Sequence, residues 1–187
     1  MIIGLTGKNA SGKGETSAYL QKKGFAYFSL SNELREEAKE KSIEATRENL
    51  IALGNELRKK FGVGYLASKI NKKISIEKEE DRNNFVVDSI RNPGEISELK
   101  KNRDFALVGV DAPISIRFER AKKRNRLGEA STLQHFIKLE ERENFNSKAN
   151  QQLDKCLKMA DKVIVNEGSL ESLHEKIDSV LNKLKNK

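Results

Sequence analysis

Short apolar runs recur along the chain at wide intervals, in the lengths expected of β-strands. None of them alternates strictly between apolar and polar residues, which is typical of strands that are covered on both faces. The runs cover residues 2–6, 25–29, 85–88, 105–111 and 162–166. We therefore predict a sheet of buried strands.

Segments with a helical period separate these runs. Thr46 is of the right type for the N-cap of one helix, and Asn92 followed by Pro93 predicts the start of another. The apolar face of the first helix consists of Leu50, Leu53, Leu57 and Phe61. Alternating strands and helices imply parallel strands that are joined by right-handed crossovers. The predicted fold class is α/β, with a five-stranded parallel sheet in a three-layer arrangement.

The chain has the length of one domain. Its 187 residues are enough to bury a core without disulfides or metal ions. No long linker rich in Pro, Gly or Ser and no internal repeat divides it. We expect residues 1–187 to form a single domain.

The charge balance favours anionic partners. Charged residues make up 34% of the chain, and the formal net charge at pH 7 is +8. Such a chain attracts nucleotides or nucleic acid. Many lysines lie beside glutamates in the helical segments, which is typical of solvated helix faces. Aromatic residues are only 6%, whereas nucleic-acid surfaces often interleave them with basic side chains, so nucleic acid is the weaker interpretation.

Other features of the composition exclude several kinds of site. The single cysteine, Cys156, cannot form an internal disulfide, and its apolar neighbours favour a buried structural thiol. The two histidines, His135 and His174, have no cysteine pair with which to form a zinc cluster. No apolar run reaches the roughly 18 residues of a membrane span, and the N-terminal apolar segment, residues 1–6, is too short for the core of a signal peptide. We expect a cytoplasmic protein that contacts no membrane.

A phosphate-binding loop follows the first predicted strand. Residues 7–14 match the pattern G-x-x-x-x-G-K and lead into a helix. Gly7 and Gly12 allow the backbone to turn successive N–H groups inward, and the helix directs its positive end at the same point. Lys13 then reaches the β- and γ-phosphates as a point charge. The residues expected to bind ATP are Gly7, Asn9, Ala10, Ser11, Gly12, Lys13, Gly14, Glu15 and Thr16.

The loop lacks the hydroxyl that usually binds Mg²⁺. Gly14 stands where most such loops have Ser or Thr. Glu15 or Thr16 could serve through water, or Asp88, which closes the third predicted strand at the place of a Walker-B acid. We expect Asp88 to be the metal ligand, with Glu15 acting through water.

Two kinase families resemble parts of the chain. Gly12, Lys13 and Gly14 resemble the loop of adenylate kinases, which also has glycine after the lysine. Residues 29–35 are similar to that family's second-strand motif, whose final arginine, here Arg35, holds the acceptor phosphate. Asn32 departs from the motif, because aspartate is usual at that position.

The later part of the chain resembles dephospho-coenzyme A kinases. Residues 110–113 are followed by Arg120 and Arg124 at the spacing that both families share. Residues 160–166 are similar to the last strand and base-contacting loop of that family, which implies that Asn166 contacts ATP. The middle of the chain departs from it and looks like two less defined groups. These are uncharacterised adenylate-kinase-like proteins and kinase-like segments of some deoxycytidylate-deaminase-related proteins.

The resemblance covers essentially the whole chain and implies the P-loop nucleoside monophosphate kinase superfamily. It implies a helical acceptor-binding insertion at about residues 34–83 and a short lid at about 124–135. Phosphoryl transfer needs positioning and positive charge, and the planar fork of arginine suits both. The expected catalytic residues are Lys13, Asp88, Arg91, Arg120 and Arg124. The expected acceptor-binding residues are Arg35, Asn55, Arg58 and Arg91.

Each of these arginines also has a purely structural interpretation. Arg91 could form a salt bridge with Glu95 one turn further on, and Arg35 could pair with a neighbouring glutamate. Arg120 and Arg124 share a helical face with Arg117, which could be no more than a solvated surface.

The predicted function is an ATP-dependent phosphotransferase with ATP and Mg²⁺ as cofactors. It would phosphorylate a nucleoside or deoxynucleoside monophosphate by direct in-line transfer of the γ-phosphate. Dephospho-coenzyme A kinase is the enzymatic alternative, and a non-catalytic ATP-dependent nucleic-acid-binding module is the other. The expected partner is a small-molecule phosphate acceptor, with the protein a monomer or homodimer.

Overall fold

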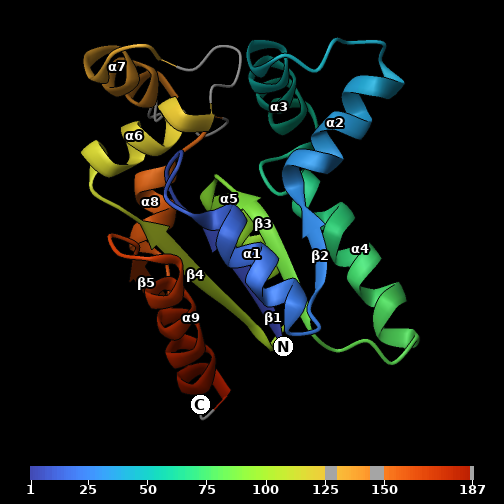
Figure 1. The fold of residues 1–187 in the computed structure, drawn as a ribbon. Helices are drawn as coiled ribbons and strands as arrows, with labels where there is room; N and C mark the ends of the chain where they lie inside the picture. The colour runs from blue at the N-terminus through green and yellow to red at the C-terminus, as the bar shows by residue number, and fades with distance from the viewer. Residues whose placement is uncertain (125–129, 144–149, 186–187) are drawn as a thin grey trace.

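The computed structural model describes residues 1–124, 130–143 and 150–185. Within this part of the chain, five parallel strands form one sheet in the order β2-β3-β1-β4-β5 (Figure 1). The strands are β1 (Ile2–Thr6), β2 (Ala26–Ser29), β3 (Phe85–Ile90), β4 (Phe105–Asp111) and β5 (Lys162–Val165). The central strand β1 pairs with β3 on one side and with β4 on the other. The predicted fold class is confirmed.

Helices connect these strands and cover the sheet. They are α1 (Lys13–Lys22), α2 (Leu30–Glu40), α3 (Arg47–Phe61), α4 (Tyr65–Glu79), α5 (Pro93–Leu99), α6 (Ile114–Arg124), α7 (Leu133–Glu143), α8 (Leu153–Lys158) and α9 (Leu170–Lys185). Helices α2 to α4 occupy the stretch between β2 and β3 where the insertion is expected. The predicted lid includes residues 125–129, which lie outside the described part, while Arg124 ends α6 and Leu133 begins α7.

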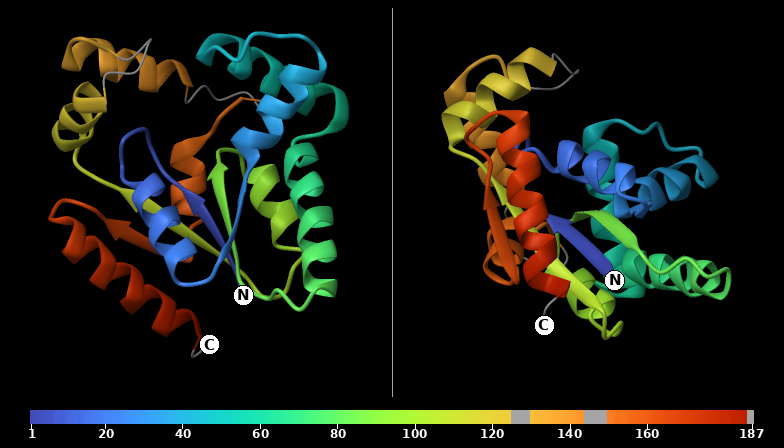
Figure 2. Two further views of the ribbon diagram at one scale, coloured as in Figure 1. Left: turned by 45° about the vertical axis from the view of Figure 1, so that its right-hand side comes forward. Right: turned by 60° about the horizontal axis from the view of Figure 1, so that its bottom comes forward.

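Two cores lie on opposite faces of the sheet. Successive strand residues point to opposite faces, so Val86 packs in one core and Val87 in the other. The core around Val86 is covered by α1 and α9, and the core around Val87 by helices that include α4, α5 and α8 (Figures 1 and 2). Both faces of the sheet are therefore apolar, which explains why the strands read as continuous apolar runs.

Helices α6 and α7 form a smaller apolar cluster of their own. Ala121, Ala130 and Phe136 are buried in it. Figure 1 shows these two helices on one side of the molecule's upper end and helices α2 and α3 on the other. The phosphate loop lies between the two groups, at the carboxyl end of β1.

Both predicted helix starts are confirmed. Thr46 caps α3, because its side chain accepts a hydrogen bond from the backbone N–H of Asn49 at 3.2 Å. Asn92 caps α5 and forms a capping box with Glu95, with Pro93 in the first turn.

Three details differ from or refine the expectation. Phe61 is 51% exposed, because α3 ends there and its ring stacks on Tyr65 instead of entering the core. Strand β3 runs past Asp88 to Ile90. Cys156 is fully buried as expected, and burial raises the pKa of its thiol to about 12.

Among the described helices, none has the length and apolar content needed to cross a bilayer.

Candidate active site

The phosphate loop has the shape that its glycines require. Gly7 and Gly12 have φ angles of 146° and 110°, and Ala10 between them has a φ of 60°. A Cβ on Gly7 would lie 2.0 Å from the carbonyl oxygen of Val110, and one on Gly12 would lie 2.2 Å from Nδ2 of Asn166. Any side chain at either position would therefore displace the loop.

Lys13, the first residue of α1, lies under the loop. Its Nζ donates to the carbonyl oxygens of Gly7 at 2.7 Å and Lys8 at 2.9 Å. The pKa of Lys13 is lowered to about 8, chiefly by burial; the charge of Asp88 raises it, and nearby arginines lower it. The site thus concentrates positive charge around one lysine, which is the electrostatic condition for binding a polyanion.

The loop residues fit a nucleotide phosphate. Gly7 and Gly12 let the backbone form a concave turn at the N-terminus of α1, where N–H groups point outward from the helix. Ser11 is completely buried, and its hydroxyl has no hydrogen-bond partner among the described residues. A cradle of this kind, with an unsatisfied donor beside it, suits phosphate oxygens.

Asp88 is the best placed of the expected metal ligands. Its negative charge raises the pKa of Lys13. Its Oδ1 accepts a hydrogen bond from the backbone N–H of Ser89 at 2.6 Å. Thr16 is buried and donates its hydroxyl to the carbonyl of Gly12 at 3.1 Å, while Glu15 is exposed.

No three His, Cys, Asp or Glu side chains of the described residues group as a metal cage. Mg²⁺ in phosphotransferases is commonly bound by one or two carboxylates together with substrate phosphates. The residues present fit that pattern and not an all-protein site.

Ser89, next to Asp88, has a backbone conformation that side chains seldom adopt. Its φ is 67°, in the left-handed region. Ala10 of the phosphate loop shares this property. Strained backbone at two points of one site is typical of ligand-binding positions, where the surrounding structure holds it in place.

From α6, Arg124 reaches the phosphate loop and Arg120 reaches Asn166. Arg120 donates to the backbone oxygen of Asn166 at 3.1 Å and to its Oδ1 at 3.4 Å. Arg124 donates to Oδ1 of Asn9 at 3.0 Å. Arg124 therefore contacts the loop directly, and Arg120 contacts the side chain of Asn166 beside it.

Asn166 supports the loop with its side chain. It is 5% exposed, and its Nδ2 donates to the carbonyl oxygen of Ser11 at 2.9 Å. Because Oδ1 accepts from Arg120, both ends of the amide have protein partners. The side chain expected to contact ATP thus holds the loop and Arg120 together.

Sequence reasoning did not single out the role of Arg117. This side chain is 3% exposed and pairs with Glu140 of α7, and its Nε donates to the carbonyl of Ala112 at 3.0 Å. Glu140 also binds Lys8 of the phosphate loop, with 3.1 Å between Nζ and Oε1. The spacing of Arg117 before Arg120 was visible in the sequence, but its partner, on another helix, was not.

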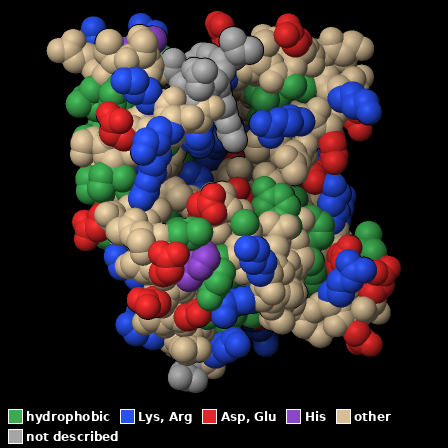
Figure 3. All heavy atoms as spheres, in the orientation of Figure 1, with side chains coloured by type: hydrophobic (Ala, Val, Ile, Leu, Met, Phe, Trp, Pro, Cys, Tyr) green, Lys and Arg blue, Asp and Glu red, His purple; other side chains and the backbone are tan. Residues whose placement is uncertain are grey.

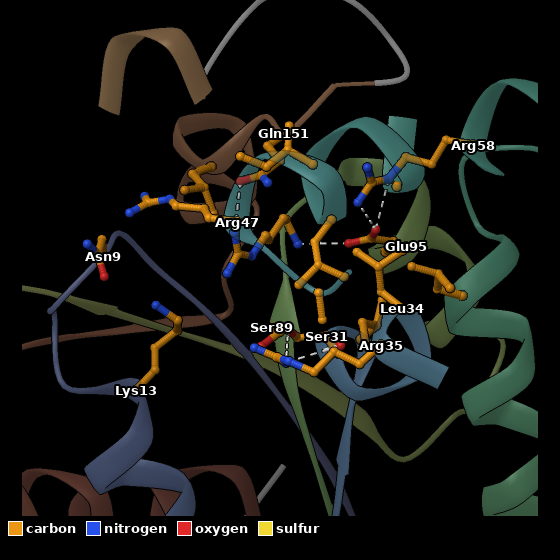
Figure 4. Close-up of a pocket in the computed structure, with 18 of the residues that line it drawn as sticks. Asn9, Lys13, Ser31, Leu34, Arg35, Arg47, Arg58, Ser89, Glu95 and Gln151 are labelled. Carbon is orange, nitrogen blue, oxygen red and sulfur yellow. Dashed lines mark hydrogen bonds and ion pairs between the residues drawn. The ribbon is translucent and has the colours of Figure 1, made fainter. Parts of the chain in front are cut away.

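A cavity of about 390 Å³ extends from the phosphate loop toward α2 and α3. Figure 4 shows Lys13 and Asn9 on one side of it and Arg58 with Glu95 on the other. The basic residues that line it are Lys13, Arg35, Arg47, Arg58 and Arg91. The apolar part of the wall includes Leu30, Leu34, Leu50, Ile51 and Leu66. Figure 3 shows blue Lys and Arg side chains around the hollow at this end of the molecule.

Arg35 and Arg58 line the cavity as expected, but they are held differently. Arg35 donates from Nη1 to the hydroxyl of Ser31 at 2.6 Å, and no ion pair to it is found in the described part of the chain. Arg58 is buried and forms an ion pair with Glu95 at 2.8 Å. Asn55 is not among the described residues of the cavity wall, and its Oδ1 lies 3.5 Å from Nη1 of Arg58.

Glu95 joins Arg58, Arg91 and Asn92 into one unit. Its Oε1 accepts from the side chain of Arg58, and its Oε2 accepts from the backbone N–H groups of Arg91 at 2.8 Å and Asn92 at 3.0 Å. The interaction expected between Arg91 and Glu95 thus involves the backbone. Nη1 of Arg91 instead donates to Gln151 at 3.1 Å.

The fold and the phosphate loop together define a P-loop protein with the fold of P-loop kinases. A family model described as an AAA domain matches residues 3–143. The chain is 30% identical over 188 residues to the UPF0200 protein PYRAB09750 of Pyrococcus abyssi, covering 98% of this chain and 97% of the relative. The chain therefore belongs to the AAA domain family that the model describes and to the UPF0200 family.

A second relative contains more than this chain. The UPF0200/UPF0201 protein of Archaeoglobus fulgidus is 32% identical over 185 residues, covering 98% of this chain. The chain spans 55% of that relative's length.

Solved structures share the fold at low sequence identity. TT1252 from Thermus thermophilus is 23% identical with a TM-score of 0.62, and the match covers 98% of this chain and 97% of that one. Dephospho-CoA kinase from Campylobacter jejuni is 15% identical with a TM-score of 0.56, covering 98% and 96%. These likenesses concern the fold, and a nucleotide- or kinase-like activity is consistent with it.

Proposed function

We propose that the protein is a kinase that transfers the γ-phosphate of MgATP to a nucleoside or deoxynucleoside monophosphate. The observation that carries the proposal is a single cavity that joins Lys13 of the phosphate loop to Arg35 and Arg91. A donor site and an acceptor site that share one cavity can bring two phosphates together for in-line transfer.

The donor side is assigned to the loop and α6. The backbone N–H groups of residues 7–14 bind the triphosphate, and Lys13 contacts the β- and γ-phosphates. Arg120 and Arg124 offset the charge on the equatorial oxygens of the transferred group. Asp88 would hold Mg²⁺, with Glu15 acting through water, and the ion would supply positive charge at the phosphate oxygens.

The acceptor side is assigned to Arg35 and Arg91, with Arg58 on the same wall. An oxygen of the acceptor phosphate forms a bond to the γ-phosphorus while the bond to the β,γ-bridging oxygen breaks, which yields ADP and a nucleoside diphosphate. The attacking oxygen is already ionised at neutral pH, so the reaction needs no general base. The arginine-rich wall favours an acceptor that carries a phosphate over one that offers only a neutral hydroxyl.

The decisive experiment measures ADP formation from MgATP with a panel of nucleoside and deoxynucleoside monophosphates and dephospho-coenzyme A. We expect turnover with one or more of the monophosphates. Turnover with dephospho-coenzyme A alone would assign the alternative kinase. ATP binding without turnover of any acceptor would overturn the proposal in favour of a nucleotide-dependent binding protein.

A further inference from the structure

Strand β3 contains one extra residue where it reaches the cavity. Residues 4 and 6 of β1 have a single residue between them, whereas their partners on β3, Val87 and Ile90, have two. These two residues, Asp88 and Ser89, form a β-bulge in the pairing of the central strands. Bulges beside binding sites redirect side chains that a regular strand would point elsewhere.

The bulge changes which face of the sheet the following side chains meet. Val87 and Ile90 pack in the same core, although a regular strand would point residues three positions apart to opposite faces. Ser89 absorbs the difference with its φ of 67°, and its side chain lines the cavity. The irregularity of β3 thus brings a hydroxyl group to the cavity wall.

This backbone conformation is costly for serine. A Cβ crowds the backbone in the left-handed region, whereas glycine adopts it freely. Glycine would therefore form the same bulge without strain, yet the position carries a hydroxyl. Strain of this kind is typical of residues whose side chains act on a ligand.

The hydroxyl of Ser89 has a donor to offer. Its oxygen accepts a hydrogen bond from the hydroxyl of Ser29 at 3.4 Å, and no further bond of this side chain is found in the described part of the chain. A serine hydroxyl can donate one hydrogen bond in addition to those it accepts. Since an ionised phosphate oxygen can only accept, a hydroxyl with a free proton suits it.

The neighbouring side chains suit the same kind of ligand. In the view of Figure 4, Ser89, Ser31 and Arg35 lie in the lower part of the cavity, and Lys13 lies across from them. All four line the cavity wall. A phosphate in this part of the cavity would meet charged donors and a neutral hydroxyl together.

We propose that Ser89 binds the acceptor phosphate by donating its hydroxyl proton to one of the phosphate oxygens. The inference rests on the proposed function for the identity of the acceptor. It gives the bulge of β3 a role in substrate binding, one residue beyond Asp88.

The test uses two substitutions of Ser89 that remove the hydroxyl in different ways. Ser89→Ala keeps the Cβ and the strained backbone, whereas Ser89→Gly removes both the side chain and the strain. With the best nucleoside monophosphate of the panel, each should raise the KM of the acceptor roughly tenfold, because one hydrogen bond to a charged group is lost. The KM of ATP should change less than about twofold.

Ser42 provides a matched control. It is exposed in the turn after α2, has a φ of 54°, and is not among the described residues of the cavity wall. Ser42→Gly should leave the KM of the acceptor unchanged. Both glycine variants should be at least as stable in urea as the unsubstituted chain, because each relieves a left-handed side chain.

Three kinetic results would overturn the inference. One is an acceptor KM that neither substitution of Ser89 changes, which would leave the kinase itself standing. Another is a rise in Ser89→Gly without one in Ser89→Ala, which would trace the effect to the backbone. The third is an equal rise in the KM of ATP and of the acceptor, which would indicate a general disturbance of the site.

A binding measurement keeps the inference distinct from the proposed function. Inorganic phosphate is titrated calorimetrically into the full chain while a non-hydrolysable ATP analogue with Mg²⁺ fills the phosphate loop. Weaker phosphate binding by Ser89→Ala and Ser89→Gly than by Ser42→Gly supports the inference even if no monophosphate is turned over. Equal binding by the three variants overturns it, as does failure of the unsubstituted chain to bind phosphate at about tens of millimolar.

Discussion

Lys13 is the residue on which the donor site depends most directly. It occupies the floor of the loop and donates to two loop carbonyl oxygens. We expect Lys13→Ala to lower kcat at least about 100-fold, because a positive charge at the phosphates is lost, while the fold persists. Steady-state rates and circular dichroism check this, with Lys22→Ala at the exposed end of α1 as the control. Full activity in Lys13→Ala would remove the loop lysine from the mechanism.

The pKa of Lys13 also makes nucleotide binding dependent on pH. The pKa is about 8 in the free protein, and a bound phosphate should raise it, because opposite charge favours the protonated amine. Near pH 8, binding of ATP should therefore take up part of a proton, and affinity should fall as the pH rises above 8.

Calorimetry in two buffers of different ionisation enthalpy measures this uptake. Lys13→Arg, which stays protonated, is the matched control, and it should show a smaller uptake at the same pH. Identical proton uptake by the two proteins would mean that another group, such as ATP itself, accounts for it.

Gly14 has room for the hydroxyl that most related loops carry. A Cβ there would have no heavy atom within 4 Å beyond its immediate helix backbone and chain neighbours. We expect Gly14→Ser to fold and to gain about 0.5 kcal/mol in free energy of unfolding from helix propensity. It should also lower the Mg²⁺ concentration for half-maximal activity, which Gly14→Ala should not do. An unchanged Mg²⁺ dependence in Gly14→Ser would place the metal away from this position.

Among the secondary-structure elements, α5 combines a local and a long-range function. Its capping box uses Asn92 and Glu95, and the same Glu95 carboxylate binds Arg58 of α3. A seven-residue helix thus orients the backbone of Arg91 and holds the insertion against the sheet.

Removal of Glu95 should be strongly destabilising. Glu95→Ala leaves Arg58 buried without its counter-charge and breaks the cap of α5, so we expect a loss of about 3–5 kcal/mol in free energy of unfolding. Urea denaturation measures it. Glu119→Ala, at an exposed position of α6, should change stability by less than about 0.5 kcal/mol. Similar small losses of unfolding free energy in both variants would show that the contacts of Glu95 contribute little to stability.

For the whole molecule, ion pairs connect the phosphate loop with α6, α7 and α8. Glu140 of α7 pairs with Arg117 of α6 and with Lys8 of the phosphate loop, and Lys8 also pairs with Asp154 of α8 at 3.1 Å. A ligand in the loop is therefore positioned to stabilise both sides of the fold at once.

Nucleotide binding should raise the melting temperature of the entire chain. MgATP at about 100 times its Kd adds about 2.7 kcal/mol to the free energy of unfolding, or roughly 5–10 °C for a chain of this size. Differential scanning fluorimetry measures the shift. Arg35→Ala, on the acceptor side, should retain it, whereas Lys13→Ala should lose most of it. Equal shifts in these two variants would separate ATP binding from the loop.

Most of the fold could be predicted from the sequence, because the signals that determine strands and helix starts are local. Apolar runs buried on both faces predicted the strands, and polar caps such as Thr46 and Asn92 predicted the helix starts. Phe61 shows the limit of this reasoning. Its position in the helical repeat places it on the buried face of α3, but the helix ends there and the ring lies at the surface. Periodicity does not determine where the partner surface stops.

The sequence by itself determined the phosphate loop, since Gly7, Gly12 and Lys13 lie close together along the chain and the backbone conformations that the glycines allow are intrinsic to them. Only the tertiary structure decided the partners of the arginines. Arg117 meets Glu140, Arg58 meets Glu95, and Arg91 meets Gln151 across 23, 37 and 60 positions. Such pairings depend on how helices pack over the sheet. The physical reason is that a charged side chain is satisfied by whichever partner the fold brings near, and its sequence neighbours do not reveal that partner.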